Sequence, residues 1–233
     1  MASETKELDK PSLLDTIQKR FADEGGRESV TRLLYIGTIP KSSTPRIVCS
    51  YHEDFLKEID ADVSGLMILQ PETFLNLIEA TPDAIMALLR HIAKQSEEAE
   101  PALDNVRVLA SSEDCPSRAF VSWSYRSVNL KPEPTLVIDE EDIVGTCYES
   151  YSKLVQLGQK LNDADLSHAD ISAALDNLRQ RYAEFIPTNE RLKALTGVAG
   201  ITTLEEYLEI FDAPIEVNLD RELVWPPPPA LEY

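Results

Sequence analysis

The chain has 233 residues, of which 43% are hydrophobic, so it is long enough to bury at least one sizeable core. Its 41 acidic and 22 basic residues give a formal net charge of -19, which repels nucleic-acid phosphates and anionic lipid surfaces. Composition therefore argues against nucleic acid and membranes as partners, and favours the basic surfaces of other proteins.

The N-terminal half of the chain alternates predicted strands and helices. Residues 1–29 form an arm with one short amphipathic helix at 11–24, which two glycines end. The elements that follow are a strand at 31–39, a helix at 51–59, strands at 63–69 and 73–79 joined by a Gln-Pro-Glu turn, a helix at 81–95, and strands at 105–110 and 118–125. The order βαββαββ predicts a ferredoxin-like α+β domain over residues 30–130, with its helices on one face of a mixed antiparallel sheet.

The C-terminal half is predicted to be helical. An acidic, proline-marked connector at 131–139 leads into an all-helical extension at 140–212 and then into an extended, proline-rich tail at 213–233. The expected helices span 140–161, 167–185, 188–196 and 203–211, and the last begins with the capping box of Thr203 and Glu206. In the tail, the segment WPPPP is polyproline II, which aromatic-lined grooves bind. The partner-binding residues that we predict there are Trp225, Pro226, Pro227, Pro228 and Pro229; the alternative is that the tail wraps its own domain.

Catalytic and metal sites are not indicated. The chain contains no GxSxG, HExxH, GxGxxG or GxxxxGK[ST] motif, and its three histidines lie on separate segments. His91 is expected at the surface of its helix. The three cysteines, Cys49, Cys115 and Cys147, are odd in number and have no CxxC pairing, so we predict packing residues in a reducing compartment. The charged N-terminus has no apolar signal core, and the expected location is the cytoplasm or the cytoskeleton.

Three segments taken together resemble the flavin-binding blue-light sensor domain called BLUF. They are RLLYIGT, VSGLMILQPETFLNLIEATPDAI and RAFVSWSY, in the family's order and spacing, and the resemblance covers less than half of the chain. It implies a flavin held between the two helices of the domain. It also implies photochemistry that uses a tyrosine of the first strand, matched by Tyr35, and a glutamine of the third strand, where Asn76 stands.

Two polar contacts of that family's flavin are altered in this chain. Asn76 is one methylene shorter than the glutamine, and Ala61 stands in place of an asparagine that hydrogen-bonds the flavin. A tyrosine, Tyr125, replaces a methionine. Each lost amide leaves a buried flavin edge unpaired, at a cost of about 1 to 3 kcal/mol. We therefore expect a BLUF-like scaffold without a cofactor; the alternative is a domain that keeps FAD, bound through Tyr35 and Asn76, and acts as a blue-light or redox sensor.

The same side chains have plain structural interpretations. Tyr35 is expected to be a strand aromatic with its hydroxyl at a surface, because strands favour aromatic residues. Asn76 and Glu79 are expected to satisfy turn and sheet-edge groups rather than to contact a ligand, because buried polar atoms require partners. Trp123 is expected in the core, with its indole N–H hydrogen-bonded.

A BLUF-like domain without the full flavin set also resembles a small eukaryotic family that is named for testis expression. Its recurring hairpin is matched here by GLMILQPETFLNLIE. The resemblance implies a protein family that occurs in organisms with motile cilia. It also implies that the protein is a non-catalytic structural or adaptor subunit of the ciliary axoneme, in the central apparatus or the radial spokes. The partners implied are proteins of a large assembly, with no small-molecule substrate.

Overall fold

The computed structural model describes residues 30–96, 98–134, 138–163 and 168–213, and also Thr16 and Lys19, which are helical. The rest of the predicted helix at 11–24, and the tail from residue 214 onward with all five of its predicted partner-binding residues, lie outside the described part. The first elements are β1 (Val30–Thr38), α2 (Pro45–Glu58), β2 (Ser64–Leu69), β3 (Thr73–Ala80), α3 (Pro82–Ser96), β4 (Asp104–Cys115) and β5 (Trp123–Ser127). The later elements are the 3-10 turn η1 (Glu140–Asp142), α4 (Ile143–Asp163), α5 (His168–Asp176), α6 (Leu178–Arg181), the 3-10 turn η2 (Ala183–Phe185), α7 (Asn189–Thr196) and α8 (Leu204–Phe211).

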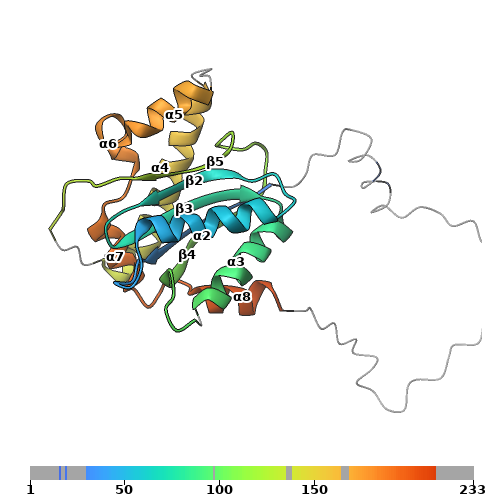
Figure 1. Ribbon diagram of the computed structural model, residues 1–233, viewed down its shortest axis with the longest axis horizontal. Coiled ribbons are helices and arrows are strands. Elements are labelled where there is room, and N and C mark those ends of the chain that lie inside the picture. The colour runs from blue at the N-terminus through green and yellow to red at the C-terminus, as the bar shows by residue number, and fades with distance from the viewer. Residues whose placement is uncertain are drawn as a thin grey trace, which may run out of the picture.

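Five strands form one mixed sheet in the order β4-β1-β3-β2-β5. Strand β1 pairs with β3 and β4, and β2 pairs with β3, all antiparallel, whereas β5 lies parallel to β2. The predicted α+β class and the order βαββαββ are thereby confirmed, as are the C-terminal helices. Strands β4 and β5 follow one another in the sequence and yet occupy opposite edges of the sheet (Figure 1).

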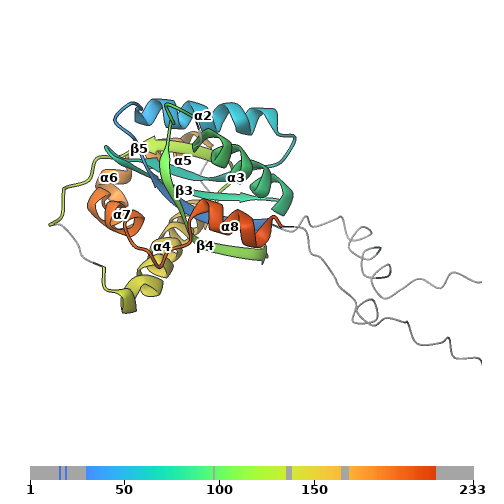
Figure 2. The ribbon, with the colours of Figure 1, turned by 90° about the horizontal axis from the view of Figure 1, so that it is seen from below.

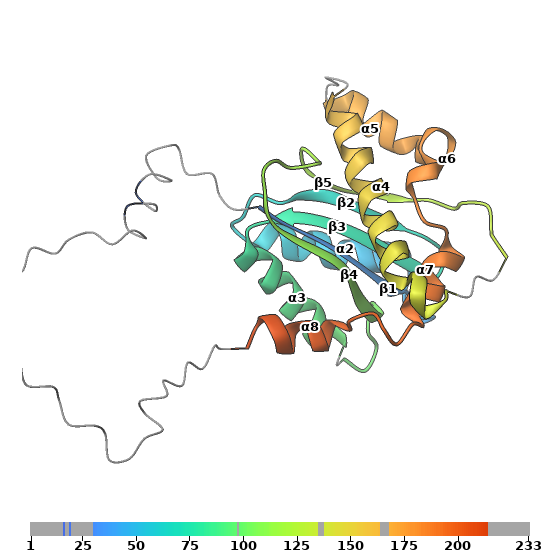
Figure 3. The same ribbon diagram turned by 180° about the vertical axis from the view of Figure 1, so that it is seen from behind.

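Helices cover both faces of the sheet (Figure 2). Side chains of β1 alternate between the faces, so that Leu33 and Tyr35 pack toward α2, α3 and α8, while Leu34 and Ile36 pack toward α4 to α7. Figure 3 shows α4 crossing this second face. All residues of β2 and β3 are buried as a result. The extension thus supplies the second apolar layer that the sheet needs.

Several element boundaries differ from the predictions. Helix α2 begins at Pro45 rather than at residue 51, because the Thr44 side chain caps it by accepting the Ile47 N–H at 3.3 Å and proline suits the first turn. The capping box of α8 is present as predicted. The single helix predicted at 167–185 was wrong, since Asn177 and Tyr182 leave helical backbone angles and divide the segment into α5, α6 and η2.

The last strand of the sheet is also shorter than predicted. Residues 118–122 form a connection rather than strand, and only Trp123–Ser127 pair with β2. This connection carries the chain from one edge of the sheet to the other. The carboxylate of Glu79, at the end of β3, accepts the backbone N–H groups of Ala119, at 2.8 Å, and Phe120, at 3.0 Å.

Glu79 is fully buried and receives two side chains as well. Arg32 Nε of β1 donates to it at 2.7 Å, and the Ser64 hydroxyl of β2 donates at 2.9 Å. Arg32 in turn donates through Nη2 to the Ser117 carbonyl at 3.0 Å, and Arg118 reaches the Glu79 carbonyl at 2.8 Å. The described contacts of Glu79 therefore join β1, β2 and the connection before β5 to one another, as predicted for a structural rather than a ligand-binding residue.

Glu79→Gln should lower the free energy of unfolding by about 3 to 5 kcal/mol, because it leaves the Arg32 guanidinium in the interior without its anion. It also turns one acceptor oxygen into a donor facing N–H groups. Chemical denaturation measures the effect. The matched control is Glu72→Gln, which removes the exposed pair with Lys193 (2.8 Å) and should cost about 1 kcal/mol or less. Equal losses in the two variants would contradict this role of Glu79.

Candidate functional site

The two residues predicted to contact a flavin lie opposite one another in the sheet. Tyr35 of β1 and Asn76 of β3 are paired in the antiparallel register, and both side chains are fully buried. Asn76 Nδ2 donates to the Tyr35 hydroxyl oxygen at 2.7 Å. The expectation that the tyrosine hydroxyl lies at a surface was wrong, because helix α2 covers this part of the sheet.

A residue of α2 completes this polar cluster. His52 Nδ1 lies 2.8 Å from the Val48 carbonyl, and its Nε2 lies 2.9 Å from the Tyr35 hydroxyl. Because a carbonyl only accepts, Nδ1 carries the proton and Nε2 accepts from Tyr35. On the other side, Trp123 Nε1 donates to Asn76 Oδ1 at 3.2 Å. The predicted bonding of the Trp123 N–H is thus present.

These bonds form one directional chain from Trp123 through Asn76 and Tyr35 to His52 and the Val48 carbonyl. We call these four side chains the Tyr35–His52 cluster. Burial lowers the pKa of His52 to about 4 and raises the pKa of Tyr35, so both are neutral at physiological pH. A neutral imidazole that is fully enclosed and already hydrogen-bonded at both nitrogens is not available as a base for a substrate.

Aromatic rings pack between α2 and α3, and a hollow of about 540 Å³ remains beside them, lined by Tyr51 and Gln95 among others. The His91 ring of α3 stacks between Tyr51 and Phe55 of α2, with centroid distances of 4.5 and 4.3 Å. The Tyr51 hydroxyl donates to the His91 carbonyl at 2.7 Å. His91 is therefore half-buried rather than a surface residue as predicted, and burial lowers its pKa.

This packing does not fit a flavin ring between the two helices. The polar atoms of Tyr35, His52 and Asn76 already have protein partners, and Ala61 packs with the apolar core beside them. Residue Tyr125 is more than a third exposed and lies beyond Trp123, at a centroid distance of 6.0 Å. The sequence analysis did not identify His52 as buried, because it placed Tyr51 and Phe55 on the inward face of the predicted helix. The spacing of four residues between Val48 and His52 would have put both on one helix face.

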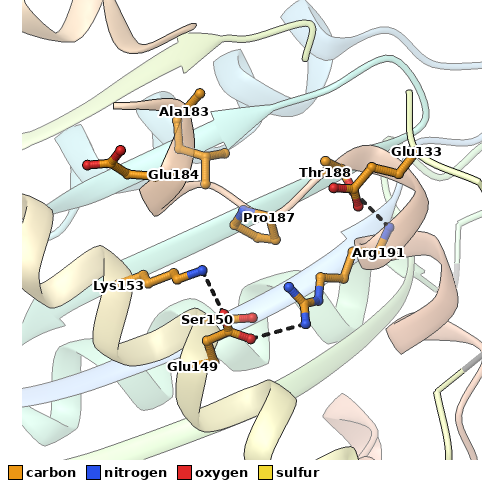
Figure 4. A pocket seen from close by; sticks show the side chains of 10 residues that line it. Glu133, Glu149, Ser150, Lys153, Ala183, Glu184, Pro187, Thr188 and Arg191 are labelled. Atoms are coloured by element: carbon orange, nitrogen blue, oxygen red, sulfur yellow. Dashed lines mark hydrogen bonds and ion pairs between the residues drawn. The ribbon is translucent and has the colours of Figure 1, made fainter. Parts of the chain in front are cut away.

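Elsewhere on the protein, a hollow lies between α4 and the segment that leads into α7 (Figure 4). Glu149 there pairs with Lys153 at 2.6 Å and with Arg191 at 3.1 Å, and the bond to Lys153 holds the pKa of Glu149 below its usual value. The Thr188 hydroxyl donates to Glu133 at 2.9 Å. Within this hollow, Glu149 is thus neutralised by Lys153 and Arg191.

Two other site types are not found within the described ranges. They contain no cluster of three or more histidine, cysteine or acidic side chains placed to bind a metal ion. No helix among them is both long and apolar enough to cross a bilayer. The three cysteines form no disulfide, and Cys49 and Cys147 are buried, as packing residues are.

The cluster makes stability depend on pH. The folded pKa of His52, about 4, lies below the unfolded value of about 6.5, so the unfolded chain binds a proton that the folded chain refuses. Relative to His52→Gln, wild-type stability should be constant above about pH 6.5 and should fall below it by about 1.4 kcal/mol per pH unit, to a total of roughly 3 kcal/mol.

Urea denaturation between pH 7 and pH 4 measures this difference. Tyr35 and Tyr51, the titratable groups packed against His52 besides His91, stay neutral in that range because burial raises the pKa of each. The matched control is His91→Gln, whose half-buried ring should change the pH dependence less. Parallel pH profiles for wild type and His52→Gln would show that His52 is charged in the fold.

Solved structures similar to this chain include BLUF proteins. A Klebsiella pneumoniae BlrP1 complex with calcium and cyclic di-GMP is 20% identical, over 42% of this chain and 24% of its own, at a TM-score of 0.34. The BlrP1 BLUF domain is 19% identical, over 44% and 66%, at 0.35, and the BLUF protein BlrB in its dark state is 18% identical, over 43% and 73%, at 0.33. This chain thus spans about a quarter of full BlrP1, and at these scores we infer no ligand or activity from the matches.

The sequence of residues 29–213 matches the family described as testis-expressed protein 47. The match includes the whole sheet, the Tyr35–His52 cluster and the helices of the extension. It confirms the predicted resemblance to a family named for testis expression. Since the match covers most of the chain, the protein belongs to the testis-expressed protein 47 family.

Proposed function

We propose that this protein is a non-catalytic structural or adaptor subunit of the ciliary axoneme, in the central apparatus or the radial spokes. It uses a BLUF-like scaffold without flavin to dock protein partners. The observation that carries the proposal is the closed packing between α2 and α3, where the rings of His52, His91, Tyr51 and Phe55 fill the space that the sensor family gives to its cofactor. A scaffold whose ligand space is filled by its own side chains is suited to binding through its surface.

The surface of the protein supports a role in protein assembly. On α4, Val144 and Tyr148 are 79% and 69% exposed and lie one helical turn apart, and on α8 Ile210 and Phe211 are also exposed. Exposed apolar side chains that cluster on one helix face are typical of protein contacts. The net charge of -19 favours basic proteins over nucleic acid or lipid as partners.

The family's description supports the axonemal location. Testis is the tissue in which flagellated cells are built, and an adaptor of the flagellum would be expressed there. The proposed location is thus the cytoplasm, as part of the cytoskeleton of the cilium or flagellum.

One observation favours a second candidate, a flavin-dependent blue-light or redox sensor. Tyr35 and Asn76 do lie together at 2.7 Å, as a tyrosine and an amide would in such a sensor. This function requires the His52 and His91 rings to leave the space between the helices. It predicts bound FAD, whereas the adaptor role predicts none.

Fractionation of flagella tests the adaptor role. The protein should remain with axonemes after detergent extraction, together with a reproducible set of companion proteins. Roughly 1 M salt, where the Debye length is about 3 Å, should weaken contacts that depend on its negative charge. Recovery in the detergent-soluble fraction would contradict the proposal, and a flavin absorbance band in protein from a flavin-replete host would favour the sensor.

The tail offers a separate prediction. If Trp225 anchors the tail on a partner, Trp225→Ala should weaken axonemal binding by about 2 kcal/mol or more, because buried tryptophans are frequent hot spots. The thermal midpoint of the isolated protein should stay almost unchanged. If the tail wraps its own domain instead, the midpoint should drop by roughly 2 to 4 °C per kcal/mol lost, with assembly unimpaired. Pulldown of companion proteins and thermal unfolding separate the two outcomes.

A further inference from the structure

The two edge strands of the sheet, β4 and β5, differ in whether other described residues pair with their outer sides. At the β4 edge, the Val108 N–H donates to the Thr202 carbonyl at 3.0 Å, and Arg107 forms a bridge with Thr203. At the other edge, no described residue pairs with the outer side of β5. An open strand edge presents backbone donors and acceptors to any extended chain that reaches it.

The pairing with β2 shows which backbone groups of β5 face outward. The Val128 N–H donates to the Leu69 carbonyl at 2.8 Å, and the Ser122 carbonyl accepts from Gly65 at 3.4 Å. Even-numbered residues therefore face β2, and the odd-numbered Trp123, Tyr125 and Ser127 turn their N–H and carbonyl groups outward. Of these groups, the Tyr125 carbonyl already accepts from Arg126 Nη1 at 2.7 Å and has a second lone pair for another donor.

A hollow flanks this edge on each face of the sheet. On the α2 side, a space of about 580 Å³ is lined by Cys49, Glu53, Leu69 and Tyr125, among others. On the α5 side, a space of about 200 Å³ has one apolar wall, formed by Phe120, Ile171 and Leu175 among others, and polar residues that include Ser124 and Ser172. Side chains of an added strand would alternate between these two hollows, because successive residues of a strand point to opposite faces. When a peptide adds to a sheet edge as a strand, pockets for its alternate side chains give the binding its specificity.

The charges at the edge indicate the chemistry of the occupant. Arg126 is neutralised by Asp176 at 2.7 Å, and Lys57 lies 3.8 Å from Asp54. Glu53 forms no ion pair with any described residue, and it lines the larger hollow beside the apolar walls of Leu69 and Tyr125. A lysine or arginine can lay its aliphatic stem on such walls and place its charge near the carboxylate. Arg46 also lines this hollow and can face a polar residue of the same strand.

We infer that the outer edge of β5 binds an extended, basic segment of a partner protein, which adds to the sheet as a sixth strand. Its branched apolar side chains enter the hollow beside α5, and a basic side chain reaches Glu53 in the hollow beside α2. A second copy of this chain is disfavoured as the occupant, because each copy carries a net charge of -19. The inference specifies the partner chemistry of the proposed adaptor.

Two variants of Ser127 isolate the edge from the rest of the fold. Ser127→Pro removes an outward N–H and places a ring in the path of an added strand, while the bonds to β2, which use even-numbered residues, remain. Ser127→Ala keeps the N–H and is the matched control. Both variants should keep the far-ultraviolet circular dichroism of the full-length protein.

The probe is a fluorescein-labelled nonapeptide in which valine alternates with threonine and the central threonine is replaced by lysine. Measured by fluorescence anisotropy, it should bind wild type and Ser127→Ala equally and Ser127→Pro at least tenfold more weakly. A peptide with glutamate in place of the lysine should bind wild type at least tenfold more weakly, and Glu53→Gln should reduce that preference. Hydrogen exchange of the Tyr125 and Ser127 amides should slow on binding.

Three results would overturn the inference: no anisotropy change with wild type, equal binding to Ser127→Pro, or no preference for lysine over glutamate. None of these depends on axonemal retention, since the adaptor role can use other surfaces. Loss of axonemal retention with intact peptide binding would instead sink the proposed location. The two failures are therefore distinguishable.

Discussion

The carboxylate of Glu79 is the interaction on which the arrangement of the sheet depends. It gathers donors from β1, β2 and the connection after β4, and that connection must pass from one edge of the sheet to the other. With the connection fixed, β5 lies parallel to β2, and its Trp123 reaches Asn76. A buried charge of this kind is tolerated because its partners supply both an opposite charge and well-placed hydrogen bonds.

The Tyr35–His52 cluster connects the sheet to its first helix through polar rather than apolar contacts. Every bond in it has a fixed direction, because the Val48 carbonyl sets the tautomer of His52 and the tautomer sets the role of Tyr35. A network whose hydrogen bonds are all made favours one position of α2. The polar side-chain atoms that form it already have partners within the protein. The tyrosine and the amide that a sensor uses to contact its cofactor therefore serve here to hold α2 against the sheet.

Local signals in the sequence predicted much of the fold, and non-local contacts account for most of the errors. The hairpin around Pro71, the helix after Thr81 and the capping box at Thr203 depend on neighbours within a few residues, so their patterns are visible in sequence. The burial of Tyr35 depends on His52, 17 residues away, and the place of β5 depends on Glu79, 40 residues from Ala119. No periodicity reveals such pairs. The fold class was thus accessible from sequence, whereas the closed state of the candidate site was not.

The second face of the sheet has a consequence for how the protein is made. Its apolar side chains come from β1, β2 and β3, but most of the buried residues that cover them lie between Cys147 and Ile201. A growing chain therefore completes its sheet long before it can bury that face, and exposed apolar strands are prone to aggregate. A mutation that ends translation between β5 and α7 would leave this face wholly or partly uncovered. Such a product would be cleared by the cell's quality control, so even a late nonsense mutation should act as a complete loss of the protein.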